Sequence, residues 1–247
     1  MKYKFDGSID GIFSCILRCF INRENPNELT CDPVQLSLTD TTVEVETDYA
    51  NNKRVINALY KYCGSATLHD LKYAFRSGDK NKNTVIFNYL KRTFECRKNI
   101  SDKFSESVVM NYYELIKRIS LEVHRMKGFL RFSESEKGIF YAHFEPDNDV
   151  ADLLVPHFAS RFKNIPFAIH DVKRNKLVMH YNGKTETVSP NFPISVILGK
   201  NEENFDNLWK AYYDSVSIKE RTNQKLMLSF MPARYHKHLN EKRLKIN

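Results

Sequence analysis

The feature that most constrains the fold is a change of hydrophobic period inside residues 108–181. From Val108 to Met126, apolar side chains recur at the spacing of one face of an amphipathic helix. Beyond this stretch the apolar residues alternate with polar ones in short runs, which is typical of strands. In order, the segment predicts helix, strand, strand, helix, strand and strand. We therefore expect an α+β protein with a C-terminal core of helix, hairpin, helix and hairpin.

Local signals set the boundaries of the first half of this core. Gly128 is predicted to end the first helix, and Glu122 is predicted to face solvent on it. Two strands, at residues 129–132 and 139–145, are predicted to form a hairpin around the polar loop 133–138.

The second half of the core begins with a turn whose last residue, Asp149, is predicted to cap the next helix. Pro156 removes one backbone hydrogen bond from that helix and predicts a kink or a late start. Residues 167–171 and 176–181 are predicted to form a second strand pair, and residues 182–200 to contain strand remnants and loop.

The N-terminal part is predicted to be α/β. Tyr3 and Phe5 alternate with charged residues and predict a short strand, after which Ser8 or Asp10 is expected to cap a helix. A further strand is predicted at residues 41–47. Helical spacing returns in three later segments, at residues 52–62, 68–75 and 84–97.

Domain boundaries are predicted from composition. The best candidate boundary lies in residues 79–106, where two polar stretches, 78–83 and 98–106, are typical of surface connections. Neither stretch is rich enough in Pro, Gly or Ser to be a free linker. We expect an N-terminal α/β region at 1–83 and a C-terminal α+β domain at 84–247, the latter ending in a helical basic tail.

Composition excludes several classes of protein. With 247 residues, 42% of them hydrophobic, the chain has enough apolar surface for a sizeable core. No run approaches the roughly 18 apolar residues of a membrane span, and the start lacks the order of a signal peptide, so a cytoplasmic location without membrane contact is expected. Five cysteines without CxxC spacing favour neither disulfides nor zinc. No cofactor or metal is expected.

Positive charge is concentrated at the C-terminal end. The net charge of the chain is +8, and residues 219–247 carry eight Lys or Arg against two Glu, a net charge of +6. Basic side chains interleaved with planar rings suit phosphate contact and base stacking. The alternative is a solvated tail or a basic amphipathic helix that packs on its own domain. The candidate nucleic-acid-binding residues are Lys173, Arg174, Lys219, Arg221, Lys225, Arg234, Tyr235 and Lys237.

A second candidate site combines imidazole and carboxylate groups. Because histidine titrates near neutral pH and a carboxylate can orient it, we consider His143, Glu145, His170 and Asp171 as catalytic residues. The alternative assigns these residues, and the neighbouring aspartates, to turns, caps and strand ends. HExxH, GxSxG, Walker A and GxGxxG patterns are all absent, which removes support for common hydrolase, kinase and dinucleotide-binding classes.

Several ordered motifs resemble an uncharacterised bacterial family labelled probable DNA metabolism protein. The motifs are FDGSIDGIFSCI (5–16), MKGFLRF (126–132), YAHFEPDND (141–149), LLVPHFASRF (153–162), AIHDVKR (168–174) and FMPARYHKHLNE (230–241). The resemblance implies association with a putative DNA modification or repair protein of the radical SAM class, and in some relatives fusion to a uracil-DNA glycosylase-like domain. It carries over no catalytic residues. Ala233 and His236 depart from the usual pattern, which has a basic and an aromatic residue there.

Three functions follow as expectations. The first is a component of DNA metabolism or repair that binds nucleic acid or presents it to a radical SAM partner. The second is an enzyme acting on DNA through the histidine and carboxylate residues, and the third is a protein-only adaptor of the radical SAM partner. Whether the chain is an enzyme is left open by the residues themselves.

Overall fold

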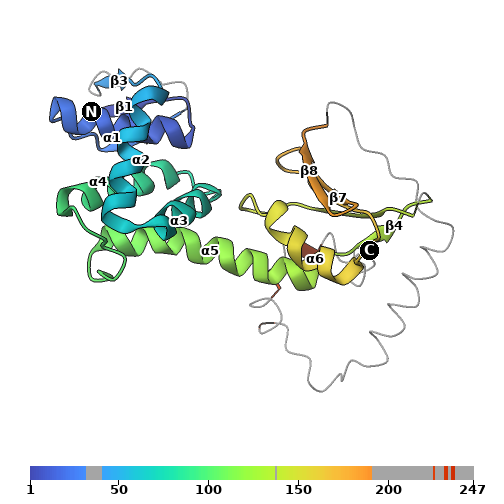
Figure 1. Ribbon diagram of the computed structural model, residues 1–247. Helices are drawn as coiled ribbons and strands as arrows, with labels where there is room; N and C mark the ends of the chain where they lie inside the picture. The colour runs from blue at the N-terminus through green and yellow to red at the C-terminus, as the bar shows by residue number, and fades with distance from the viewer. Residues whose placement is uncertain (32–40, 137, 191–224, 226–230, 233–234, 237–247) are drawn as a thin grey trace. The chain divides into compact units, whose positions relative to one another are not determined.

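The computed structural model describes residues 1–31, 41–136, 138–190, 225, 231–232 and 235–236. It contains two compact units, unit 1 (residues 1–120) and unit 2 (residues 121–247), each described separately below (Figure 1). Helices and two separate sheets make up the described residues, which confirms the predicted α+β class.

Unit 1 contains a parallel sheet in the order β2-β1-β3. Its strands are β1 (Lys2–Lys4), β2 (Glu28–Thr30) and β3 (Thr42–Glu44). Parallel neighbours need a crossover connection, and helix α1 (Ile9–Asn22) supplies it between β1 and β2. The sequence predicted β1 and β3, where apolar residues alternate with charged ones, but not β2, because Leu29 is the only apolar residue of that strand.

Helix α1 begins where the sequence predicted. Ser8 is its N-cap, and the Ser8 Oγ accepts a hydrogen bond from the Gly11 backbone N–H at 2.9 Å. Gly11 is needed for close packing, since a Cβ there would lie 2.6 Å from the Phe5 ring and 2.3 Å from the Asp6 Oδ1. The segment that follows β1 therefore packs closely against the first turn of α1.

The remaining helices of unit 1 surround an apolar core. They are α2 (Tyr49–Cys63), α3 (Ser65–Phe75), α4 (Lys82–Cys96) and the first part of α5 (Ser107–Phe129). All four were predicted from their apolar spacing. The largest fully buried side chains of this core are Tyr3, Ile12, Ile16, Leu59, Leu71, Ile86, Phe87, Tyr89 and Tyr112.

The division of the chain into two compact units falls between residues 120 and 121, within α5. Helix α4 contacts α1 and α3 of unit 1. The predicted domain boundary, between residues 83 and 84, was drawn from composition alone, and it stays a prediction.

Unit 2 contains a mixed sheet in the order β4-β5-β6-β7-β8. Its strands are β4 (Ser133–Glu134), β5 (Phe140–Phe144), β6 (Phe167–Asp171), β7 (Lys176–Tyr181) and β8 (Lys184–Val188). The pairs β4–β5 and β6–β7 are antiparallel. This confirms the second predicted hairpin, whereas the first forms with β4 in place of the predicted strand 129–132. Strand β8 extends the second hairpin by a further antiparallel strand, in a segment predicted only as strand remnants and loop.

Strands β5 and β6 are parallel and are joined by a helical crossover. A 3-10 turn, η1 (Asp152–Leu154), precedes helix α6 (Val155–Phe162), and Pro156 lies in the first turn of α6. This is the late start that the proline predicted, because the first turn has no use for its missing N–H. Aromatic rings of α6 cover one face of the sheet, with Phe162 5.0 Å from Phe140 and 5.6 Å from Phe167 between ring centroids.

One predicted strand is wrong. Helix α5 continues through Gly128 to Phe129, and the Leu130 N–H still donates to the Met126 carbonyl at 3.0 Å. The first strand of the hairpin is therefore β4, inside the stretch predicted as loop. Gly128 does not take the positive φ that a helix-ending glycine usually has, and the helix continues through it. The predicted helical tail lies almost wholly outside the described residues.

Candidate functional site

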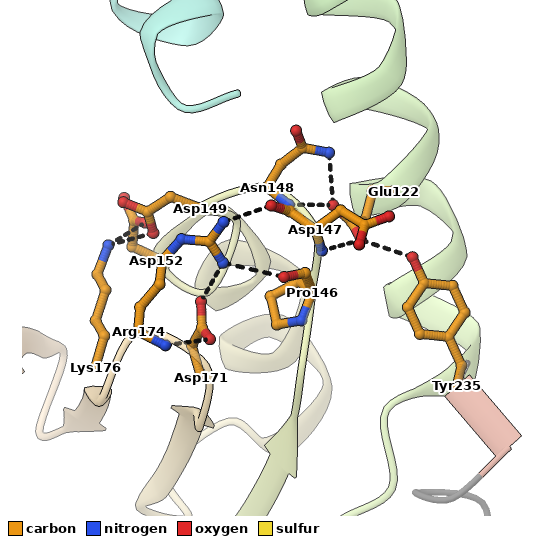
Figure 2. Close-up of polar contacts among 10 residues, drawn as sticks. All are labelled: Glu122, Pro146, Asp147, Asn148, Asp149, Asp152, Asp171, Arg174, Lys176 and Tyr235. Atoms are coloured by element: carbon orange, nitrogen blue, oxygen red, sulfur yellow. Dashed lines mark hydrogen bonds and ion pairs between the residues drawn. The ribbon is translucent and has the colours of Figure 1, made fainter. Parts of the chain in front are cut away.

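The loop between β5 and η1, residues 146–149, is held by a carboxylate from α5 (Figure 2). The backbone N–H groups of Asp147 and Asn148 each donate to Glu122 at 2.8 Å. The Asn148 side-chain amide donates to the same carboxylate at 2.7 Å. Three donors from one loop therefore converge on Glu122, and the loop conformation is set by α5.

Glu122 is buried, with 3% of its surface exposed, so the prediction that it faces solvent is wrong. The sequence held a signal for this. Glu122 lies three residues after Ile119 and four before Met126, which places it inside the apolar stripe of the helix. Carboxylates are almost never buried without partners, and the loop supplies those partners.

Tyr235 completes the shell around this carboxylate. Its hydroxyl donates to Glu122 Oε1 at 2.6 Å, and 3% of its surface is exposed. Its ring lies 6.4 Å from the ring of Phe129 between centroids. In this arrangement the Tyr235 ring packs on the protein, so the structure gives it a contact other than the base stacking that the sequence predicted.

Arg174 holds the other side of the same loop. Its Nη1 donates to the Pro146 carbonyl at 3.1 Å and to Asp171 Oδ2 at 2.9 Å, and its Nη2 donates to the Asp147 carbonyl. Asp171 is fully buried, and its Oδ1 accepts the Arg174 backbone N–H at 3.1 Å. Arg174, predicted as a nucleic-acid contact, is thus engaged within unit 2 through charge-assisted hydrogen bonds.

A neighbouring cation extends the network to η1. Lys176 Nζ lies 2.7 Å from Asp149 Oδ1 and 3.2 Å from Asp152 Oδ1 (Figure 2). Ala151 is the N-cap of η1, and no side chain caps this turn. Asp149 therefore forms an ion pair with Lys176 and not the predicted cap.

Two histidines of the sheet, His143 and His170, lie on the face opposite the α6 rings, whereas His180 of β7 pairs with Phe167 on the α6 side. His143 and His170 are register partners on the parallel strands β5 and β6, so their side chains point to the same face. The Tyr141 hydroxyl and His170 Nδ1 are 2.7 Å apart, and the Tyr141 ring stacks beside the His143 ring with centroids 6.0 Å apart. Tyr141 was not predicted as a site residue, although its place two residues before His143 on a strand indicated a shared face.

His170 is buried, with 9% of its surface exposed, and burial lowers the pKa of its imidazole while the charge of Asp171 opposes that shift. Its Nε2 is buried and has no hydrogen-bond partner within the part of the chain that the structure describes. A neutral imidazole held by a tyrosine hydroxyl is able to accept or donate a proton at its other nitrogen.

The four residues considered as catalytic do not form one cluster. His143 and His170 share a sheet face, whereas Asp171, the next residue on β6, points to the other face and pairs with Arg174. Glu145 follows the end of β5. Within the described ranges, no three His, Cys, Asp or Glu side chains come together in a way that would hold a metal ion.

Of the remaining candidate nucleic-acid contacts, Lys173 and Lys225 are exposed. Lys219, Arg221, Arg234 and Lys237 lie outside the described residues. Among the described helices, none has the length and apolar character needed to cross a lipid bilayer.

The fold is that of an α+β protein, and in its second unit the loop 146–149 is held between Glu122 and Arg174. Residues 80–241 match the model of a family described as a domain of unknown function, DUF4130. The chain belongs to this family, which confirms that it is a member of an uncharacterised family. The comparisons with curated proteins and with solved structures gave no match.

Proposed function

We propose that this protein is a nucleic-acid-binding component of DNA metabolism or repair. The observation that carries the proposal is the concentration of charge: residues 219–247 hold a net charge of +6 out of +8 for the whole chain. A polyanion is the partner that such a segment attracts, because each neutralised phosphate releases counterions. Lys225 of this segment is exposed, and Lys173, also exposed in unit 2, adds one described cation outside it.

The proposed partner is a radical SAM enzyme of DNA modification or repair, to which the protein presents its nucleic acid. Support for this part comes from the resemblance of the motifs in residues 126–174 and 230–241 to the DNA metabolism family. The resemblance also implies that some relatives are fused to a uracil-DNA glycosylase-like domain, which supports a role in DNA modification or repair.

Titration of labelled DNA with the protein over a range of salt concentrations tests the binding. The variant with Lys225, Arg234 and Lys237 all changed to alanine loses three cations. Its slope of log affinity against log salt should fall by about three units on duplex, since each phosphate contact contributes about −0.9. Unchanged affinity and slope would contradict the proposal.

A matched control removes the same charge elsewhere. Lys53, Lys61 and Lys72 are exposed in unit 1, and their combined change to alanine also lowers the net charge by three. If DNA contacts the basic C-terminal segment, this control should keep the wild-type slope. An equal loss in both variants would show that only total charge matters.

Co-purification with the radical SAM enzyme, with and without nuclease, tests the partner. A complex that nuclease dissolves indicates that DNA bridges the two proteins, as presentation requires. A complex that survives nuclease, from a protein that binds no DNA alone, would instead identify an adaptor.

A second candidate, an acid–base enzyme acting on DNA, is favoured by the Tyr141–His170 pair and the buried Nε2 beyond it. Oligonucleotides containing uracil or an abasic site are suitable probes. Product formation that disappears in His170→Asn and persists in His157→Asn, a histidine of α6 outside this pair, would support an enzyme.

A further inference from the structure

Three aromatic rings of unit 1 meet where three of its helices end. Phe20 lies in the last turn of α1, Tyr62 in the last turn of α2 and Phe94 in the last turn of α4. The ring centroid of Phe94 is 6.1 Å from that of Phe20 and 6.2 Å from that of Tyr62, and both pairs meet edge to face. We call these three residues the aromatic patch.

The aromatic patch is partly open to solvent. Phe20 has 43% of its surface exposed, and Tyr62 and Phe94 are half-buried. Phe94 packs against the apolar core of unit 1, so the rings are supported from beneath. A planar side chain held in this way loses little conformational freedom when a flat ligand stacks on it.

Exposed cations lie beside the patch in the sequence. Arg23 follows Phe20 by three residues, at the end of α1. Arg97 and Lys98 directly follow the end of α4, which carries Phe94. Within the described part of the chain, these three cations form no ion pair. A helix C-terminus carries about half a negative charge, which a full cation beside it exceeds.

The carboxylates at the same helix ends are already paired. Glu24 accepts from the Arg18 Nε at 3.0 Å. Glu95 lies 3.6 Å from the Arg92 Nη1 and 3.9 Å from the Lys91 Nζ. Their negative charge is therefore opposed locally, and a ligand at the patch meets an excess of positive charge.

Two of the cations stand where glycine is the usual residue. Arg23 and Arg97 are the C-caps of α1 and α4, with φ angles of 55° and 50°. Glycine is common at such a position because a Cβ is strained there. The chain thus has an arginine, despite this strain, at the end of each helix that contributes a phenylalanine to the patch.

We propose that the aromatic patch binds a single-stranded nucleic acid, with an unpaired base stacked on Phe20 and the adjacent phosphates beside Arg23 and Arg97. Exposed rings next to cations suit single strands, because every unpaired base has an aromatic face that can stack, whereas the bases of a duplex stack on one another. This inference rests on the proposed nucleic-acid binding and specifies the form of nucleic acid that unit 1 recognises.

Phe20→Leu tests the inference, because leucine keeps the apolar bulk and removes the flat ring. We expect the affinity for a labelled oligothymidylate to fall about tenfold, as the loss of one stacked base does, and the affinity for a duplex to stay the same. Phe20→Tyr keeps the ring and should bind the single strand as the wild type does. Fluorescence anisotropy with the full chain measures binding, at a temperature where circular dichroism shows every variant folded.

Tyr49→Leu is the matched control. Tyr49 is the first residue of α2 and has 67% of its surface exposed. Its place at the opposite end of α2 from Tyr62 puts it roughly 20 Å from the patch. This variant should keep the wild-type affinity for the single strand. An equal loss in Tyr49→Leu and Phe20→Leu would overturn the inference, because any exposed ring would then have the same effect.

A second variant tests the cations. Arg23→Gln combined with Arg97→Gln removes two charges and keeps a Cβ at each helix end, so the backbone strain is unchanged. On the single strand, the slope of log affinity against log salt should decrease in magnitude by about 1.4, since each phosphate contact contributes about −0.7. An unchanged slope would overturn the assignment of phosphates to these arginines.

Photochemical crosslinking locates the bound strand independently of affinity. An oligothymidylate that carries bromodeoxyuridine should crosslink within residues 17–23 or 91–98, and mass spectrometry of the digested protein identifies the peptide. Crosslinks confined to residues 219–247 would overturn the inference.

Three outcomes separate this inference from the proposed function. Wild-type binding to the single strand with unchanged affinity in Phe20→Leu would overturn the patch and leave nucleic-acid binding intact. Failure of the wild type to bind any single strand or duplex would overturn both. A dimer that Phe20→Leu dissociates, with unchanged single-strand affinity, would overturn the patch as a nucleic-acid site and assign it to a contact between copies of the chain.

Discussion

The two units differ in what they bury. Among the described residues, the buried polar side chains of unit 1 are all neutral: Ser14, Asn52, Thr67, Ser77, Asn83 and Thr93. Those of unit 2 include two carboxylates and an imidazole: Glu122, Asn148, His170 and Asp171. Burying a charge costs far more than burying a neutral polar group unless it is fully paired.

The two units therefore use their charged side chains differently. Unit 1 keeps its charges near the surface, as in the Arg92–Glu106 pair at 2.7 Å, and relies on apolar contacts between helices. Unit 2 uses Glu122 and Arg174 to hold backbone groups of one loop in place. The loop 146–149 is therefore fixed from two sides, by Glu122 of α5 and by Arg174.

The largest effect is expected in the apolar core of unit 1. Phe87 is fully buried and its ring lies 6.4 Å from that of Tyr3, so Phe87→Ala removes a large side chain and leaves a cavity. The free energy of unfolding should fall by about 4 kcal/mol, measured by urea denaturation followed by circular dichroism. Phe87→Leu, which fills most of the space, should cost much less. Equal losses of unfolding free energy in the two variants would mean that stability does not depend on filling the space around Phe87.

Glu122→Ala should be the most damaging polar change in unit 2. It leaves the Asp147 and Asn148 N–H groups and the Tyr235 hydroxyl without their acceptor. We expect a loss of about 3 kcal/mol, because buried donors lose their partner. Hydrogen exchange should show the loss of protection in the loop 146–149 and not in α2 or α4. Uniform loss across both units would show that the units do not differ in the expected way.

Ser8→Ala sharpens the comparison with a smaller local change in unit 1. The Ser8 hydroxyl caps α1 through the Gly11 N–H, and its removal should cost about 1 kcal/mol. Ser8→Thr keeps an oxygen acceptor and should restore most of the stability in the same urea titration. A result near zero for Ser8→Ala would indicate that Asp6 or solvent replaces the cap.

The smallest effect concerns a surface charge of unit 1 and its pH dependence. The Arg18 guanidinium, followed by the Tyr3 hydroxyl, lowers the pKa of Glu24 from its ordinary value near 4.5 to about 2. Because the folded pKa is the lower one, the stabilisation is present above pH 4.5 and is lost as the pH falls towards about 2. Glu24→Gln should therefore be less stable than the wild type at pH 7 and equal to it near pH 2. A difference independent of pH would assign the effect to packing.

Much of the secondary structure was predictable because its causes are local. The apolar spacing of α2, α4 and α5, the Ser8 cap and the late start caused by Pro156 all depend on residues within a few positions of one another. Strand β2 and the end of α5 were missed for a local reason too. Strand β2 has one apolar residue, Leu29, and so shows no alternation, and one glycine does not stop a helix that packing favours.

The candidate site was predictable only in part. The sequence identified the strand pairs that carry His143 and His170, and their register then followed from the parallel pairing of β5 and β6. Alternation along the predicted strand 167–171 places Asp171 on the face opposite His170, but the sequence could not show that Asp171 pairs with Arg174. Arg174 and Tyr235 were chosen for charge and aromatic character, but their observed contacts depend on backbone carbonyls and on a carboxylate far along the chain.

The sequence by itself determined the α+β class, the order of helices and strands in the core, the family, and the concentration of positive charge at the C-terminal end. These properties are set by composition, motifs and spacings of two to four residues. Only the tertiary structure decided which groups pair with Glu122, among them Tyr235, which reaches it across 113 positions. A hydrogen bond depends on distance in space, and no local period in the sequence records which distant residues will meet.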